Sequence, residues 1–237
     1  SIETIIKLLK KNPDIAQILS RDVLIKVLSR SPALMKSDPI YRVICSIVNA
    51  DTSLFDAFPL EVKGRIIECL TDSSFVSIIK SISSVINKNP DFVLGLSPNR
   101  IRLLFDEIAD NVLMHLVTRY DRIDELLNLL GDKLVNRFIS IVNRNPYMFF
   151  EVKSKHLRAL VFSNASLEVK KFVVDHEPEY LSVMEFGDLL SILEASNADE
   201  ILSYLNKNKE FDRKIREKAI GEEILQVIAS KFSDRTD

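Results

Sequence analysis

The feature that most constrains this chain is a short pattern that returns along its length. An apolar helical stretch ends in a polar patch, often Asn-Pro, and a short apolar segment then leads into a second amphipathic helix. The clearest copy starts at Asn87 and reads Asn-Lys-Asn-Pro-Asp-Phe-Val-Leu-Gly-Leu-Ser. Because proline lacks a backbone N–H and disfavours a helical conformation in the preceding residue, the first helix is expected to end at Asn89. Pro90 can then begin the next helix, where its missing donor costs nothing.

Copies of this pattern are centred on residues 12, 49, 89, 120, 145, 177 and 208. Their spacing averages about 33 residues, and self-similarity at this period is typical of stacked helical hairpins. We therefore expect an all-α protein, a right-handed α-solenoid of about seven irregular helical-hairpin repeats. The copies at 49, 120 and 208 are weak, so the alternative is an irregular all-helical domain in which Asn-Pro merely ends helices.

The composition agrees with long helices joined by short loops. The 237 residues include only 5 glycines, and no stretch alternates between apolar and polar residues as a half-buried strand would. No linker rich in Pro, Gly or Ser divides the chain, so we expect a single helical-repeat domain over residues 1–237, with a frayed tail at 232–237. The last repeat is more polar than the others, as a terminal cap needs to be.

Charge and cysteine content restrict the environment and the partners. A net charge of −2 gives no overall attraction to nucleic acid or to an anionic membrane. Cys45 and Cys69 fall on apolar helix faces and suggest no disulfide framework, so we expect a reducing, cytoplasmic location. The longest uncharged run, residues 159–167, is too short to cross a bilayer, and the first residues lack the apolar core of a signal peptide. We expect no membrane partner.

Recognisable catalytic motifs are absent from the sequence. The glycines are too far apart for a phosphate-binding loop, and there is neither a Gly-x-Ser-x-Gly elbow nor a Cys-x-x-Cys pair. Asp175, His176, Glu177 and Glu179 could ligate a divalent ion, although a solvated helix end with Glu177 and Glu179 near the next helix N-terminus is the simpler interpretation. We expect no enzyme, cofactor or metal. An enzyme acting on nucleic-acid bases stays as an alternative, because acids from different repeats could still assemble.

Basic residues form the candidate binding site. They lie on successive predicted helices, at Arg137, Arg144, Lys153, Lys155, Arg158, Lys170 and Lys171. A basic stripe of this kind could follow a phosphate backbone, and Tyr147 and Phe150 could stack on bases. The alternative is that the basic residues form a solvated face and that the aromatic residues pack in the core.

The paired-helix layout resembles the HEAT/armadillo class of α-solenoids across nearly the whole chain. The turns Asn-Pro-Asp-Phe-Val-Leu-Gly-Leu-Ser and Asn-Pro-Tyr-Met-Phe-Phe-Glu-Val-Lys are also similar to the proline-containing turns of mitochondrial transcription termination factor repeats. That second resemblance implies nucleic-acid binding in a basic concave groove, but the chain departs from the family in net charge and in repeat spacing. No functional residue is carried over from either class.

These observations lead to one expected function and one alternative. We expect a non-enzymatic scaffold or adaptor that binds a protein or peptide partner on its concave surface, since stacked hairpins create such a surface. The alternative is a helical-repeat protein that binds nucleic acid through the basic residues at 137–171.

Overall fold

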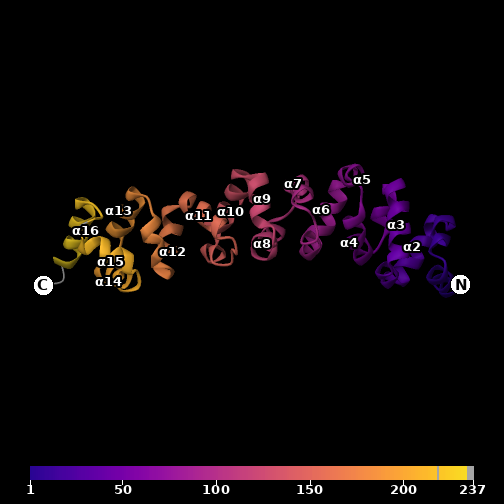
Figure 1. Ribbon diagram of the computed structural model, residues 1–237, viewed down its shortest axis with the longest axis horizontal. Coiled ribbons are helices and arrows are strands. Elements are labelled where there is room, and N and C mark those ends of the chain that lie inside the picture. Colours follow the sequence, from indigo (N-terminus) through magenta and orange to yellow (C-terminus); the bar gives the residue numbers. More distant parts are fainter. Residues whose placement is uncertain (218, 234–237) are drawn as a thin grey trace. The chain divides into compact units, whose positions relative to one another are not determined.

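A computed structural model shows that the prediction of an all-α protein is confirmed (Figure 1). It describes residues 1–217 and 219–233, is 81% helical, and contains no strand within those ranges. The chain divides into two compact units, Ser1–Leu129 and Leu130–Asp237. None of the helices in the described ranges is long and apolar enough to cross a bilayer.

The first unit is built from α-helices separated by short 3-10 helices, which are labelled η. They are α1 (Ile2–Lys11), η1 (Pro13–Ile18), α2 (Arg21–Arg30), η2 (Pro32–Lys36), α3 (Asp38–Ala50), η3 (Thr52–Ala57), α4 (Leu60–Cys69), α5 (Asp72–Ser77), α6 (Ile79–Lys88), η4 (Pro90–Val93), α7 (Pro98–Leu104), α8 (Asp110–Arg119) and α9 (Ile123–Leu130). Elements close in sequence pack together: α3 contacts η1, η2 and α4, and α6 contacts α4, η4, α7 and α8.

The second unit continues with the same kinds of element. They are α10 (Asp132–Arg144), η5 (Pro146–Phe149), α11 (Lys155–Asn164), α12 (Leu167–His176), η6 (Pro178–Val183), α13 (Phe186–Ala195), α14 (Ala198–Lys207), α15 (Lys209–Arg216) and α16 (Glu222–Ser233). Phe232 and Ser233, the first two residues of the expected tail at 232–237, belong to α16. Residues 234–237 lie outside the described ranges.

The helix-ending pattern of the sequence corresponds to one recurring backbone geometry. At seven junctions the residue after an α-helix has φ between −146° and −113° and ψ between 70° and 94°, namely Asn12, Ser31, Asp51, Asn89, Asn145, Glu177 and Asn208. A 3-10 helix follows six of them, and α15 follows Asn208. Five of the seven precede proline, and proline disfavours the helical conformation in the residue before it.

Three details of the predicted pattern need correction. The junction placed at Asn49 lies at Asp51, which no proline follows; its side chain accepts a hydrogen bond from the backbone N–H of Ser53, just as those of Asn12 and Asn89 accept from the residue two positions further on. No 3-10 helix follows Tyr120. The apolar residues between positions 75 and 86 predict one continuous helix over residues 74–87, but the backbone of Ile78 (φ −122°, ψ 28°) separates α5 from α6.

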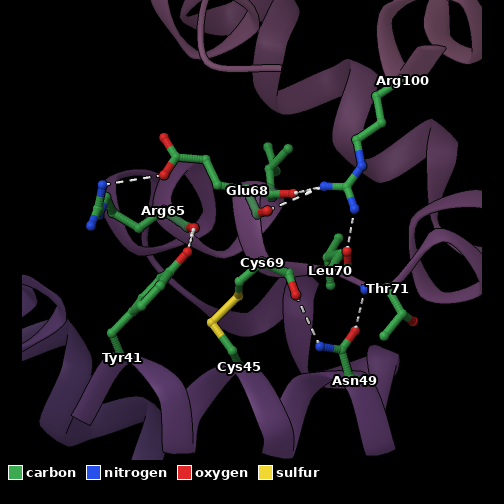
Figure 2. The surroundings of a disulfide bond; sticks show 10 residues. Tyr41, Cys45, Asn49, Arg65, Glu68, Cys69, Leu70, Thr71 and Arg100 are labelled. Atoms are coloured by element: carbon green, nitrogen blue, oxygen red, sulfur yellow. Dashed lines mark hydrogen bonds and ion pairs between the residues drawn. A yellow bond between two sulfur atoms is a disulfide. The ribbon is translucent and has the colours of Figure 1, made fainter. Parts of the chain in front are cut away.

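Asparagine side chains at the ends of α3 and α6 form matching bridges. Asn49 Nδ2 donates to the carbonyl of Cys69 at 3.1 Å, and Asn49 Oδ1 accepts from the N–H of Thr71 at 2.8 Å (Figure 2). Asn87 does the same with the carbonyl of Glu107 at 3.1 Å and the N–H of Ala109 at 2.7 Å. The bonded groups lie 20 and 22 residues beyond the asparagine in both cases. One side chain thus ties each helix to the junction between the next two α-helices.

The two cysteines lie beside the first of these bridges. Cys45 on α3 and Cys69 at the end of α4 form a disulfide, with their Cα atoms 6.0 Å apart (Figure 2). The prediction that the two cysteines form no disulfide is therefore wrong. Sequence spacing did not reveal the pairing, because it depends on the packing of α3 against α4.

Arg100 on α7 caps the C-terminal end of α4, close to the disulfide and the Asn49 bridge. Its guanidinium donates to the carbonyls of Ile67 and Glu68 at 3.2 Å and to that of Leu70 at 2.5 Å (Figure 2). The last carbonyls of an α-helix have no partner within the helix, so a guanidinium that bridges them satisfies otherwise unpaired acceptors. These hydrogen bonds link α7 to the end of α4, across 30–33 residues of the first unit.

Candidate interaction surface

The second unit carries an aromatic cluster that runs from its core to its surface. We define it as seven side chains: Tyr147, Phe149, Phe150, Phe162, Phe172, His176 and Tyr180. Phe149 is fully buried and contacts Phe150, Phe162 and Tyr180, with ring centroids 5.4–6.2 Å apart. At the other end, 59% of Tyr147 is exposed to solvent. The cluster is therefore anchored in the core and open at one end.

Helix periodicity positions the exposed end. Phe172 and His176 are four residues apart on α12, so both lie on one face, and their ring centroids are 4.4 Å apart. Nδ1 of His176 donates to the carbonyl of Phe172 at 2.8 Å, which fixes the imidazole in this place. Tyr147 on η5 meets Phe172 edge to face, with centroids 4.8 Å apart. Such pairs are a favoured aromatic geometry, so Tyr147 is held in position although most of its surface is exposed.

The basic residues expected to form a groove have different roles in the structure. Lys170 is buried; its ammonium donates to the carbonyl of Ser163 at 2.9 Å and forms an ion pair with Asp188. Lys171 bridges Asp175 and Glu200, at 3.2 Å from each. These two lysines therefore join elements of the second unit to one another.

Two of the three predicted arginines donate hydrogen bonds to backbone carbonyls of the second unit. Arg158 donates to the carbonyls of Phe150 and Val152 at 2.8 and 3.0 Å, and its guanidinium lies 3.8 Å from the carboxylate of Glu177. Nε of Arg144 donates to the carbonyl of Ser140 at 3.0 Å.

The remaining three predicted residues differ in exposure. Arg137 is half-buried on α10 and makes intramolecular interactions. Lys153 and Lys155 are exposed, and neither forms an ion pair with any residue in the described ranges. Five of the seven basic residues thus interact with other groups of the protein, and for those at 144, 158, 170 and 171 the partners are the ones described above.

The acidic residues near His176 make separate contacts rather than facing one another. Asp175 accepts from Lys171 and from the hydroxyl of Tyr204, while Glu177 faces Arg158. No group of three or more His, Cys, Asp or Glu side chains in the ranges 1–217 and 219–233 is placed to hold a metal ion.

Tyr204 is the titratable group with the largest pKa shift in this region. It is almost fully buried, and its hydroxyl donates to Asp175. Burial, together with the hydrogen bond to Asp175, raises the pKa of Tyr204 from 10.0 to about 12. A phenol with this pKa stays protonated at neutral pH and acts as a hydrogen-bond donor rather than as a general base. The Lys171–Asp175–Tyr204 network is therefore best understood as a structural link between α12 and α14.

Sequence reasoning identified Tyr147 and Phe150, named His176 only as a possible metal ligand, and missed Phe172. The spacing of four residues between Phe172 and His176 was an available signal, because it places both side chains on one face of a helix that extends to residue 176. Comparison with known proteins adds no further information: no protein-family model, no curated protein and no solved structure matches this chain.

Proposed function

We propose that this chain is a non-enzymatic helical-repeat scaffold that binds a protein or peptide partner, and that Tyr147 is central to the contact. The observation that carries the proposal is an exposed tyrosine held by aromatic neighbours at the surface of the second unit. Energetically important interface residues are enriched in tyrosine, and a preordered side chain loses less conformational entropy on binding.

The charges around the aromatic cluster support a protein partner. Acidic side chains face Arg158 and Lys171, which weakens the positive field that a phosphate backbone would require. A mixed rim of both signs around an aromatic centre is typical of protein–protein interfaces. The repeated helix junctions support the scaffold part of the proposal, because repeat arrays commonly present extended binding surfaces.

A pull-down with the immobilised chain tests the proposal. We expect Tyr147→Ala to lose a bound protein that the wild-type chain retains after nuclease treatment. Phe186→Ala is the matched control, since Phe186 is a 50% exposed aromatic of the same unit outside the cluster. Equal recovery of every protein by Tyr147→Ala and wild type would contradict the proposal.

Nucleic-acid binding is a second candidate, favoured by one observation. Lys153 and Lys155 are exposed, form no ion pair within the described residues, and follow Tyr147 closely in sequence. Stacking on Tyr147 combined with these two ammonium groups would suit a short single strand. Fluorescence anisotropy with labelled single- and double-stranded DNA and RNA, titrated with salt, tests it. Binding that falls steeply with salt and is lost in Lys153→Gln/Lys155→Gln would support it, and no binding at low salt would exclude it.

A further inference from the structure

A groove of about 570 Å³ on the first unit is lined by three lysines. α6 contributes Lys80 and Lys88, and α4 contributes Lys63. None of the three forms an ion pair with any residue in the described ranges. The single acidic lining residue is Asp56, so the lining carries a surplus of positive charge although the whole chain is slightly acidic.

Helix geometry aligns part of this lining. Lys80, Ser84 and Lys88 follow one another at intervals of four residues, so they lie along one face of α6. At a rise of about 1.5 Å per residue, the backbone positions of the two lysines are about 12 Å apart. Lys80, Ser84 and Lys88 are all exposed, so the groove is open to solvent along this row.

Two contacts hold other lining residues in place. The ammonium of Lys63 lies 6.0 Å from the centre of the Phe55 ring, a cation–π distance. The Ser81 hydroxyl donates to Asp56 at 3.0 Å. Leu60, which is 39% exposed, adds an apolar part to the lining, and Val85 lies beneath it as a 5% exposed lining residue.

We propose that this groove binds an extended acidic peptide segment. Carboxylates complement the lysines, and the apolar part of the lining offers a contact for an aliphatic side chain. An open groove suits a peptide running through it better than an enclosed small molecule. A nucleic-acid strand fits less well, because no aromatic side chain is among the lining residues available for stacking.

The spacing of the two lysines predicts the pattern of the peptide. An extended chain advances about 3.3 Å per residue, so carboxylates four residues apart are separated by about 13 Å. Residues at every second position of an extended chain lie on one face. An acidic–x–apolar–x–acidic segment therefore presents both carboxylates and the apolar residue to the groove together.

The test uses the full chain and a fluorescein-labelled peptide containing Glu-Ser-Leu-Ser-Glu between glycines. Anisotropy at low salt is expected to show binding that weakens as salt is added, and no binding of the Gln-Ser-Leu-Ser-Gln peptide. Lys80→Gln/Lys88→Gln is expected to weaken binding about tenfold. Lys7→Gln/Lys10→Gln is the matched control, since it removes the same charge from exposed positions of α1 and is expected to bind normally.

Two further arms separate the proposal from general charge attraction and from loss of folding. Asp56→Asn removes the opposing charge and is expected to tighten binding severalfold, an effect that misfolding would not produce. A peptide with adjacent glutamates, Glu-Glu-Ser-Leu-Ser, is expected to bind more weakly, because its carboxylates lie on opposite faces. Equal loss in the Lys80/Lys88 and Lys7/Lys10 variants, no effect of Asp56→Asn, or equally tight binding of an oligothymidine strand would each overturn the proposal. None of these results depends on the aromatic cluster of the second unit.

Discussion

The matching asparagine bridges at Asn49 and Asn87 make a quantitative prediction about stability. Asn87→Ala removes a donor and an acceptor that serve the junction between α7 and α8, at 3.1 and 2.7 Å. A hydrogen bond of this kind contributes about 1 kcal/mol net, and water can reach both groups left behind. We therefore expect Asn87→Ala to lower the free energy of unfolding by about 1–2 kcal/mol. Asn49→Ala removes the same pair of bonds at 3.1 and 2.8 Å and is expected to cost the same.

Urea denaturation followed by circular dichroism measures both variants. A shift of the midpoint at constant slope reports a change in stability. The double variant is expected to lose about 2–4 kcal/mol, since distant independent sites add. Asn128→Ala is the matched control, because Asn128 is exposed on α9 and its side chain makes no hydrogen bond with described residues. A loss below about 0.5 kcal/mol at both bridges would refute the expected contribution of these hydrogen bonds. A loss at only one bridge would refute the view that the two bridges are equivalent.

Three other predictions concern packing, charge burial and pH. Gly64→Ala places a Cβ against the ring of Phe92, so we expect the free energy of unfolding to fall by about 1–3 kcal/mol. Phe92→Ala is expected to reduce this loss in a double-mutant cycle, and additive losses would contradict the prediction. Lys170→Met leaves Asp188 and the Ser163 carbonyl without their partner and is expected to lower the melting temperature. Lys155→Met, at an exposed position, is the control and is expected to leave the melting temperature unchanged. Equal melting temperatures of the two variants would show that the Lys170–Asp188 ion pair is unimportant for stability. The raised pKa of Tyr204 means that its contribution is fully present below pH 10 and is lost as pH rises towards 12, so Tyr204→Phe is expected to reduce the alkaline destabilisation seen in wild type. Unchanged alkaline unfolding in that variant would contradict the assignment.

The sequence predicted the helical architecture well because its helix-ending signals are local. Asn-Pro at residues 12, 89 and 145 produces the expected junction each time, since proline restricts the residue before it whatever the surroundings. The junction at Asp51 lies two residues beyond the predicted position, because no proline marks it in the sequence. The break at Ile78 carries no proline or glycine, so only packing could place it.

The candidate surface was less predictable because it depends on which elements meet. Tyr147 and Phe149 are neighbours in sequence, yet one is mostly exposed and the other fully buried. Phe149 packs against Phe162 of α11 and Tyr180 of η6, whereas Tyr147 packs against the surface side of α12, and no local pattern records which of these elements meet. Lys170 offered a signal that was overlooked: it precedes Val173 and Val174 by three and four residues, which places it on the buried face of α12. The Lys63–Lys80–Lys88 groove joins two helices and was missed for the same reason as the disulfide.

Photo-crosslinking from position 147 tests the central proposal most directly. Tyr147 is replaced by benzoylphenylalanine in the full chain, and Phe186 is replaced in the same way as the control. If the exposed end of the aromatic cluster is a protein-binding surface, position 147 will form a defined protein adduct that position 186 does not form. Adducts with nucleic acid, the same set of adducts from both positions, or no adduct from position 147 would contradict the account.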